Sequence, residues 1–456
     1  MTYVRVPAEK QRAVTGLFSQ GSSVAPLVHE PLKRLLRQLL RAGARLFPTL
    51  LVVLVAGLLT HAVFGQAPSP DLPPNVQLET VAAGVTFPVA LRFAPDGRLF
   101  FTERFVGADA PVTGTIRVIV DGQVQPAPFA VIDLPDSAPF QEKGLLGLAL
   151  DPDFESNGFV YTYRTAASTD TLPHQHGQIL RYTAVLSGTD WIGADMTVVV
   201  DDLPVSSGCC HNGGILGFGP DRKLYLSIGY IDIRQSAQDL SNRAGSLLRF
   251  NADGSIPDDN PFVGQPGVDP AVYAYGLRNV FGFDWHPVTG GLYVTENGPT
   301  CNDELNLIVA GGNYGWPLSE VDNRCVDPGS QYTAPLLIFD PPPGLTDAAF
   351  YADERLPGYT NDLFIGSWNT GALDRIEIPE DGAGLQPVTV LTNCGQPTGD
   401  HNLLSIEPAP DGSLYFSCQE EFFPAPPATG AIYRLVLKPS PIYFPLLRVG
   451  TVQSEQ

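Results

Sequence analysis

Basic residues are scarce in this sequence, and their scarcity limits the partners the protein can have. The chain of 456 residues contains 27 Lys and Arg against 48 Asp and Glu. Residues 1–67 hold eight of the basic residues and two of the acidic ones, so the remainder has 19 basic and 46 acidic residues and a net charge of −27. A surface this acidic repels phosphate backbones, which argues against nucleic acid as a partner.

A long apolar run is also lacking. The apolar stretch from Leu50 to Leu59 is short for a membrane-spanning helix, basic residues precede it, and the small residues of Gly65-Gln66-Ala67 follow it. We expect residues 1–67 to be an export signal, with an uncleaved membrane anchor as the alternative, and residues 68–75 to be a linker. The protein is then periplasmic, extracellular or anchored on the outer face of a membrane, and it meets a membrane only if the leader stays attached.

No CxxC pair with accompanying histidine spacing indicates a structural zinc site. All six cysteines follow residue 67: Cys209, Cys210, Cys301, Cys325, Cys394 and Cys418. An even count in an oxidising compartment favours disulfides. Cys301–Cys325 and Cys394–Cys418 would each close a local loop, leaving Cys209 and Cys210 bonded to each other or both free. Our hypothesis is a vicinal disulfide that forms a hard floor under a planar ligand; the alternative is that each cysteine pairs elsewhere or stays reduced.

One turn motif recurs six times. Charged residues make up only 16% of the chain, while Gly (46) and Pro (43) are abundant, a composition typical of turn-rich β proteins. Each copy of the motif is a Pro/Asp/Gly turn followed by alternating β-branched and aromatic residues, the pattern of a strand. The copies are FAPDGRLFFTER (93–104), LDPDFESNGFVYTYR (150–164), FGPDRKLYLSIGY (218–230), WHPVTGGLYVTENGP (285–299), LPGYTNDLFIGSWN (356–369) and PAPDGSLYFSCQE (408–420).

The spacing of these copies predicts the fold. They follow one another at intervals of roughly 50 to 70 residues, long enough for a four-stranded sheet with its loops. A two-sheet sandwich would not explain the regular return of one turn. We therefore predict an all-β, six-bladed β-propeller over residues 76–437, followed by a tail over 438–456.

Three loops carry the residue types that catalysis needs. His211 in CCHNGG is a candidate general base, because histidine is the side chain that most often takes up and releases protons near neutral pH. Arg278 in YAYGLRNVFGFDWHP can form a forked pair with a carboxylate or carbonyl, or it is a structural arginine joining two blades. The loop ENGPTCNDELNLIVAGGNYGWP combines carboxylates with backbone carbonyls, the ligands that calcium takes, although acidic loops are common in an acidic protein.

Several long segments resemble the soluble glucose/sorbosone dehydrogenase family, the aldose sugar dehydrogenase-like quinoproteins. They include KGLLGLALDPDF (143–154), HNGGILGFGPDRKLYLSIG (211–229), AQDLSNRAGSLLRFNADGSIPDDNPF (237–262) and DELNLIVAGGNYGWP (303–317). The resemblance implies a six-bladed propeller, in agreement with the repeats. It further implies oxidation of an aldose sugar or related alcohol with pyrroloquinoline quinone (PQQ), calcium and an external electron acceptor.

The same resemblance implies roles for individual residues. His211 is the base that takes the hydroxyl proton while hydride passes to the quinone, and Arg278 polarises the quinone oxygens. Asn279 and Glu142 contact the cofactor, the latter at a position near quinone or sugar. Four residues match metal positions of the family. Gly298 and Pro299 offer their carbonyls to the cofactor's calcium, and Glu304 and Tyr314 match a second, structural calcium.

The sequence departs from the family where cations are expected. The family holds the carboxylates of its cofactor with one lysine and two arginines, and Asn369, Asn402 and Leu404 stand at these positions here. Because these three cations are absent, two alternatives to a quinone-dependent dehydrogenase stay open. One is a calcium-stabilised propeller that binds a carbohydrate or protein without catalysis. The other is a calcium-dependent hydrolase resembling a lactonase, in which the metal activates water.

Overall fold

The computed structural model describes residue 72 and residues 75–438, except 107–110, 137, 139–140, 300, 322–323, 327–328, 380–383 and 421–428. The described residues belong to one compact unit. The expected leader (1–67) lies outside them, as do most of the expected linker and the tail after Lys438. No helix within the described ranges has the length and apolar character needed to cross a bilayer.

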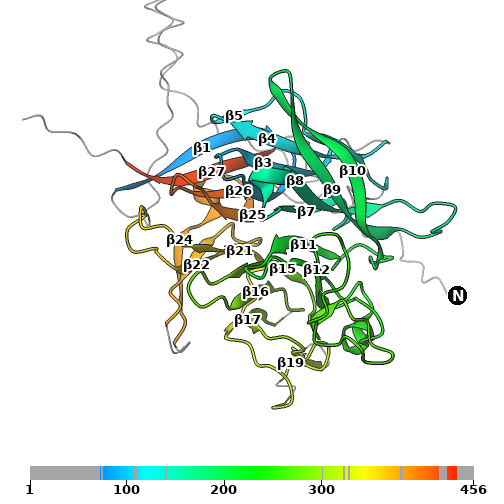
Figure 1. Ribbon diagram of the computed structural model, residues 1–456. Helices are drawn as coiled ribbons and strands as arrows, with labels where there is room; N and C mark the ends of the chain where they lie inside the picture. The colour runs from blue at the N-terminus through cyan, green and yellow to red at the C-terminus, as the bar shows by residue number, and fades with distance from the viewer. Residues whose placement is uncertain are drawn as a thin grey trace, which may run out of the picture. The chain divides into compact units, whose positions relative to one another are not determined.

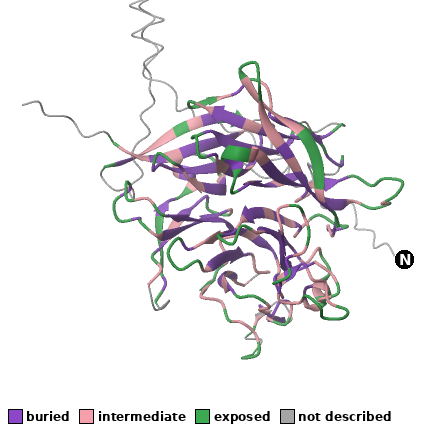
Figure 2. Cartoon of the chain, viewed as in Figure 1, coloured by how far each residue is buried: buried purple, intermediate pink, exposed green. Residues whose placement is uncertain are grey.

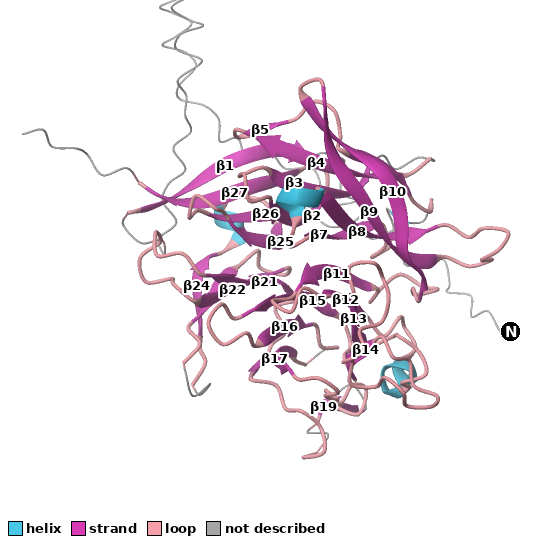
Figure 3. Cartoon of the chain, viewed as in Figure 1, coloured by secondary structure: helices cyan, strands magenta, loops and turns pink. Residues whose placement is uncertain are grey.

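Six antiparallel sheets make up six blades, which confirms the predicted all-β propeller (Figures 1 and 3). The first three blades are β2 (Pro88–Phe93), β3 (Leu99–Val106), β4 (Thr113–Val120), β5 (Gln123–Val124) and β6 (Ala130–Asp133); β7 (Leu145–Leu150), β8 (Phe159–Ala166), β9 (His176–Ser187) and β10 (Asp190–Leu203); and β11 (Gly213–Phe218), β12 (Leu224–Ile228), β13 (Ser246–Phe250) and β14 (Val272–Tyr275).

The remaining three blades complete the ring. They are β15 (Val280–Trp285), β16 (Leu292–Glu296), β17 (Asp303–Ile308) and β20 (Leu337–Phe339); β21 (Leu345–Tyr351), β22 (Asp362–Ser367), β23 (Leu373–Ile376) and β24 (Pro387–Leu391); and β25 (His401–Pro408), β26 (Leu414–Glu420) and β27 (Gly430–Leu437) with β1 (Val76–Val85). Their first strands touch in a closed cycle, β2–β7–β11–β15–β21–β25–β2, and so surround the axis.

Each repeated turn joins the first strand of a blade to its second strand. The first copy shows why its residues are needed: Gly97 has φ +88, in the left-handed region, and its amide donates a 2.9 Å hydrogen bond to the Ala94 carbonyl. Because all six turns lie at the same end of the blades, the second strands all run back toward the opposite end. That opposite end therefore receives the last residues of all six repeats.

The core lies between blades. Every residue of β12, β16, β21 and β22 is buried (Figure 2), because adjacent blades cover both faces of these sheets. One apolar cluster, for example, packs Phe100 and Ile116 of the first blade against Leu145 and Val160 of the second. The blades are thus held to one another by burial of apolar area, which stabilises the ring by about 25 cal/mol per Å².

The two ends of the folded chain meet in the sixth blade. β1 pairs antiparallel with β27, with Val76 opposite Leu437 and Leu78 opposite Leu435. The other short elements are α3 (Phe154–Asn157), η2 (Arg234–Gln238), η3 (Asn393–Gly395) and a hairpin of β18 (Glu320–Val321) and β19 (Arg324–Cys325). Cys301–Cys325 and Cys394–Cys418 form disulfides, as the sequence predicted.

Candidate active site

A cavity of about 370 Å³ opens on the axis, at the end away from the repeated turns. Its walls come from all six blades, mostly from their first strands and adjoining loops. Three aromatic rings and several aliphatic side chains make most of the wall apolar, with a few polar groups among them. The lining residues are Phe87, Val89, Arg104, Glu142, Leu146, Gly213, Ile215, Asn279, Phe281, Asn297, Gly298, Pro299, Asp303, Pro342, Gly344, Leu345, Thr346, Trp368, Asn369 and Leu404.

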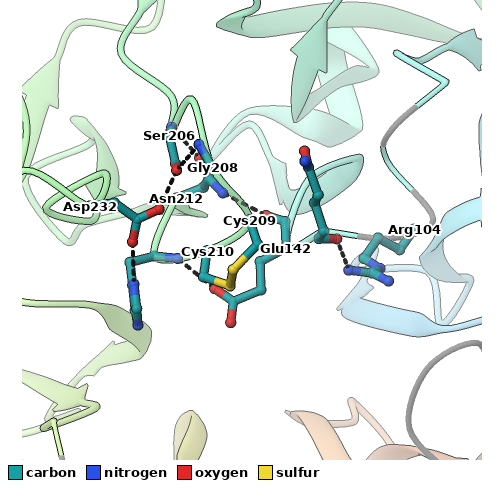
Figure 4. The surroundings of a disulfide bond; sticks show 10 residues. Arg104, Glu142, Ser206, Gly208, Cys209, Cys210, Asn212 and Asp232 are labelled. Atoms are coloured by element: carbon teal, nitrogen blue, oxygen red, sulfur yellow. Dashed lines mark hydrogen bonds and ion pairs between the residues drawn. A yellow bond between two sulfur atoms is a disulfide. The ribbon is translucent and has the colours of Figure 1, made fainter. Parts of the chain in front are cut away.

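His211, in the loop that enters β11, is not among the lining residues of this cavity but is hydrogen-bonded to one of them. Its backbone has φ +61, and its amide donates a 2.6 Å hydrogen bond to Oε2 of Glu142, which lines the cavity. The ring atom Nδ1 lies 3.0 Å from Oδ1 of Asp232, and Oδ2 of Asp232 accepts a 2.5 Å hydrogen bond from the Ser206 hydroxyl (Figure 4). Backbone and ring are therefore both held in place, as a general base requires.

The environment of Asp232 keeps it ionised. Partial burial raises the pKa of this carboxyl, but hydrogen bonds from Ser206 and His211 stabilise its charged form and leave the pKa below its usual value. An ionised carboxylate beside Nδ1 favours the proton on that nitrogen and leaves the other nitrogen of the ring to accept one. Sequence reasoning missed Asp232, because the hydrogen bond joins residues that are 21 positions apart.

Arg278 belongs to a stack of aromatic side chains that extends from His211. The His211 and Tyr230 rings lie 4.8 Å apart, and those of Tyr230 and Trp316 lie 5.4 Å apart. The Arg278 guanidinium lies over both Tyr230 (5.6 Å) and Trp316 (5.4 Å) and donates a 3.0 Å hydrogen bond to the Asn297 carbonyl. Burial lowers the pKa of Arg278, and the neighbouring Tyr230 and Glu296 act in the opposite direction.

Two buried polar atoms on the cavity wall have no hydrogen-bond partner within the described chain, namely Oδ1 of Asn279 and Oγ1 of Thr346. Asn279 is 3% exposed and Thr346 is 1% exposed. Leaving such groups unsatisfied costs about 1–3 kcal/mol each, which a bound ligand would recover. The cavity thus suits a planar aromatic ligand with polar edges, and its volume falls in the range of small-molecule sites.

The four residues expected at metal positions lie together. Gly298, Pro299, Glu304 and Tyr314 line one small cavity, together with the buried carboxyl of Glu296. Burial raises the pKa of Glu296, and repulsion from the neighbouring Glu304 raises it further. A cation would offset this repulsion. In the described residues no three His, Cys, Asp or Glu side chains converge on one metal position, so an ion here would draw on carbonyl oxygens as well.

Cys209 and Cys210 form a vicinal disulfide, which confirms that these two cysteines pair with each other. The Glu142 amide donates a 2.7 Å hydrogen bond to the Cys209 carbonyl, and Nδ2 of Asn212 donates a 3.0 Å bond to the Glu142 carbonyl (Figure 4). The disulfide loop is thus hydrogen-bonded to the segment that carries Glu142 into the cavity. The disulfide is absent from the cavity lining, so its predicted role as a floor under a ligand stays a prediction.

The positions at which the family has cations are neutral around this cavity. Asn369 and Leu404 line it, whereas Asn402 lies behind the wall and donates a 2.7 Å hydrogen bond from Nδ2 to the Trp368 carbonyl. Sequence reasoning missed Arg104, which also lines the cavity. The signal was present: Arg104 ends the first repeat, as Asn369 ends the fifth, and the ends of the repeats meet at this end of the axis.

Comparison with known proteins agrees with this geometry. Residues 85–422 match the family model described as Glucose / Sorbosone dehydrogenase. Aldose sugar dehydrogenase YliI of Escherichia coli is 28% identical over 366 residues, which is 76% of this chain and 91% of that protein. Quinoprotein glucose dehydrogenase B of Acinetobacter calcoaceticus is 34% identical over 285 residues, covering 57% of this chain and 55% of the relative.

A solved structure has the same architecture. The PQQ-bound form of aldose sugar dehydrogenase from Streptomyces coelicolor superposes with a TM-score of 0.63 at 27% sequence identity. The match covers 82% of this chain and all of that one, so the likeness extends over the whole propeller.

Proposed function

Since the chain belongs to the glucose/sorbosone dehydrogenase family, we propose that it oxidises an aldose sugar or a related alcohol with pyrroloquinoline quinone and calcium. The observation that carries this proposal is the His211–Asp232 pair, which is hydrogen-bonded through the His211 amide to Glu142 on the wall of a cavity with aromatic rings and unsatisfied polar atoms. Two relatives, an aldose sugar dehydrogenase and a quinoprotein glucose dehydrogenase, support the substrate class and the cofactor.

Oxidation of a sugar hydroxyl requires removal of one proton and one hydride. Pyrroloquinoline quinone, when bound, supplies the hydride acceptor. His211 takes the hydroxyl proton on Nε2, because Nδ1 is engaged by Asp232. The Asp232 carboxylate then stabilises the positive charge that develops on the imidazole ring, and it keeps the ring from rotating away from the substrate.

Other residues hold the reactants. Asn279 and Thr346 offer their unsatisfied oxygens to polar edges of the cofactor. Arg278, which precedes Asn279 in the chain, borders the small neighbouring cavity and would polarise the quinone oxygens from there. Glu142 is positioned at the wall by the vicinal disulfide loop, where it meets cofactor or sugar. The cofactor's calcium would draw on the Gly298 and Pro299 carbonyls, and a second, structural calcium on Glu304 and Tyr314; all four residues border the small neighbouring cavity. Electrons then pass to an external acceptor.

Export is part of the proposal. All six cysteines of the chain are paired in disulfides, which form and persist in oxidising compartments and are rare in the cytosol. The basic and apolar segment within residues 1–67 would supply the export signal.

The test combines binding with turnover. Calcium-loaded protein is titrated with pyrroloquinoline quinone by calorimetry, and reduction of a redox dye is then followed with a panel of aldoses. We expect binding and dye reduction, and a fall in kcat of about 10²–10⁴-fold in His211→Ala with cofactor affinity preserved. Dye reduction that survives unchanged in His211→Ala would contradict the assigned base.

One observation favours the alternatives. Among the described residues, the lining of the axial cavity has two carboxyl groups, Glu142 and Asp303, against a single arginine, and this balance disfavours an anionic cofactor. Absence of quinone binding at high concentration, together with calcium-dependent binding of a glycan or hydrolysis of a lactone, would therefore replace the dehydrogenase with a carbohydrate-binding propeller or a hydrolase.

A further inference from the structure

The turn that follows β12 has an unusual backbone. Ile231 has φ +50 and Asp232 has φ +63, so two consecutive residues other than glycine lie in the left-handed region. This conformation is rare for a β-branched residue such as isoleucine, and it persists only where the surrounding structure holds it. His211 also has a positive φ, of +61, and its carbonyl accepts a 3.2 Å hydrogen bond from the Ile231 amide. The turn is therefore fixed against the loop that carries His211.

The two residues that flank Ile231 both contact the His211 ring. Asp232 lies at the edge of the ring, with its Oδ1 3.0 Å from Nδ1. Tyr230 packs on the face of the ring: the ring centres are 4.8 Å apart and the planes are inclined by 32°. Contacts of this kind between ring faces are favourable. One short turn thus gives a single imidazole two contacts from two directions.

The two contacts constrain different motions of the imidazole. The hydrogen bond to Asp232 directs Nδ1, but the ring can still tilt about the line that joins the two bonded atoms, because the torsion that attaches an imidazole to its Cβ has broad energy minima. A second ring packed on the face opposes this tilt. The tilt decides where Nε2 points, and therefore whether the proposed base meets the hydroxyl group of its substrate.

Tyr230 is itself held on several sides. Its amide donates a 2.9 Å hydrogen bond to the Arg278 carbonyl, and its own carbonyl accepts a 3.0 Å hydrogen bond from the Ser236 hydroxyl. The ring of Trp316, which is 3% exposed, lies 5.4 Å from the Tyr230 ring, and the Arg278 guanidinium carbon lies 5.6 Å from it. A side chain held in this way is ordered in advance, so it can limit the movement of a neighbouring ring at little cost in entropy.

We propose that Tyr230 is a positioning residue that fixes the tilt of the His211 ring, and that it acts together with Asp232 through the turn they share. The inference rests on the proposed function, because it concerns the base of that same site. Tyr230 takes up no proton in this role, since it meets the imidazole through its aromatic ring. Phenylalanine at position 230 should therefore serve as well as tyrosine, whereas an aliphatic residue should not.

The first experiment observes the His211 ring directly and needs neither cofactor nor substrate. In protein that contains isotope-labelled histidine, NMR gives ring C–H signals for the seven histidines of the chain, and His211→Gln identifies the His211 signals by their disappearance. Tyr230→Leu should remove the ring-current shift of these signals, and Tyr230→Phe should retain it. Unchanged His211 signals in Tyr230→Leu would overturn the proposal.

Steady-state kinetics test the consequence for the reaction. Tyr230→Leu should lower kcat by about ten- to 100-fold, the order of loss that a small misplacement of a reacting group causes, and it should change KM less. Tyr230→Phe should keep the wild-type constants. A Tyr230→Leu protein with wild-type kcat would show that the ring needs no support from Tyr230.

The matched control is Tyr273→Leu. Tyr273 is a half-buried tyrosine of the same blade, and it lies outside the lining that the described residues form around the axial cavity. Its ring centre is 5.2 Å from that of Tyr225 and 5.6 Å from the Arg249 guanidinium carbon, so it has a ring and an arginine as neighbours, as Tyr230 has. This substitution should leave kcat, KM and the His211 signals unchanged.

Combining two substitutions tests whether Tyr230 and Asp232 act on the same ring. If both hold it, either single variant already frees the imidazole, so Tyr230→Leu should cost much less in the Asp232→Asn protein than in the wild type. Losses that multiply would show that the two residues act independently, and would overturn the shared role.

The outcomes separate this proposal from the proposed function. Dye reduction by the wild type, with His211 signals that Tyr230→Leu leaves unshifted, overturns the role of Tyr230 and leaves the dehydrogenase standing. A lost ring-current shift in Tyr230→Leu, with no dye reduction by the wild type, overturns the dehydrogenase and leaves the packing of the two rings established. If Tyr230→Leu does not fold, a nuclear Overhauser effect between the Tyr230 and His211 ring protons of the wild type decides the question, and its absence overturns the proposal.

Discussion

Nδ1 of His211 lies 3.0 Å from Oδ1 of Asp232, and this one contact sets both the orientation and the protonation of the ring. We predict that Asp232→Asn lowers kcat by about 10²–10⁴-fold with a smaller change in KM, because an amide can stabilise the wrong tautomer of the imidazole. Steady-state kinetics check this prediction. Ser206→Ala, which removes one hydrogen bond to Asp232, should cost less; losses of equal size in KM and kcat would contradict an orienting role.

A second prediction separates the vicinal disulfide from the structural ones. Replacing Cys209 and Cys210 with serine should lower kcat/KM by about five- to tenfold, because the loop that bonds to the Glu142 backbone loses its constraint. The free energy of unfolding should barely change, because a bond between neighbouring residues closes almost no loop. Activity assays and denaturant unfolding measure the two effects.

The control for that pair is the disulfide of the closing blade. Removing Cys394–Cys418 should reduce the free energy of unfolding by about 3–4 kcal/mol, the loop-closure value for some 25 residues, with catalytic constants preserved at low temperature. If the vicinal double variant lost stability instead of activity, the role assigned to its loop would be wrong.

Calcium should stabilise the fold as well as the site. At free calcium about 100 times its Kd, the free energy of unfolding should rise by about 2.7 kcal/mol, and a chelator should remove this gain. Glu304→Gln should abolish the calcium effect, since the carboxyl borders the small cavity where the expected ligands gather. Glu354→Gln, at an exposed carboxyl, should preserve it. Denaturant unfolding with and without chelator is the measurement.

The other end of the axis predicts a dependence of stability on pH. There a second cavity of about 220 Å³ is lined by Arg92, Asp284 and Glu407, with Nη1 of Arg92 lying 3.3 Å from Oε2 of Glu407. Burial raises the pKa of Asp284 to about 6 and that of Glu407 to about 7. The folded state therefore holds protons that the unfolded chain releases near pH 4, so the free energy of unfolding should fall as pH rises from about 4 to about 7.

Glu407→Gln removes one of these groups. It should flatten that fall by on the order of 2–3 kcal/mol, while Glu377→Gln at an exposed carboxyl should leave the slope unchanged. Unfolding measured at intervals between pH 4 and 8 tests the sign directly. A wild-type protein that gained stability over this range would contradict the assignment.

Much of the fold could be predicted because its information is local. Each of the six Pro/Asp/Gly turns can be recognised from about a dozen consecutive residues, and each joins the first and second strands of a blade. The disulfides Cys301–Cys325 and Cys394–Cys418 likewise close short loops. Local signals of this kind need no knowledge of how the blades are arranged around the axis.

The site was predictable only in part, because its contacts join different blades. The glycine-rich loop around His211 marked that residue in the sequence. Asp232 has no such signal, because it is one of many acidic residues and only the fold places it next to the His211 imidazole. Arg104 was marked only by its place at the end of the first repeat, since nothing in the segment TER itself distinguishes an arginine that lines the cavity from one that faces solvent. The partners of both residues were set by the closing of the ring.

The pairing of β1 with β27 has a consequence for how the protein is made. Val76 lies opposite Leu437, so the sixth blade cannot form until residue 437 has been synthesised. Until then β1 presents an unpaired edge that invites pairing with a neighbouring chain. A ribosome that stalls late in the message would therefore release an open ring prone to aggregate, and a chaperone that shields the first strand would raise the yield of complete protein.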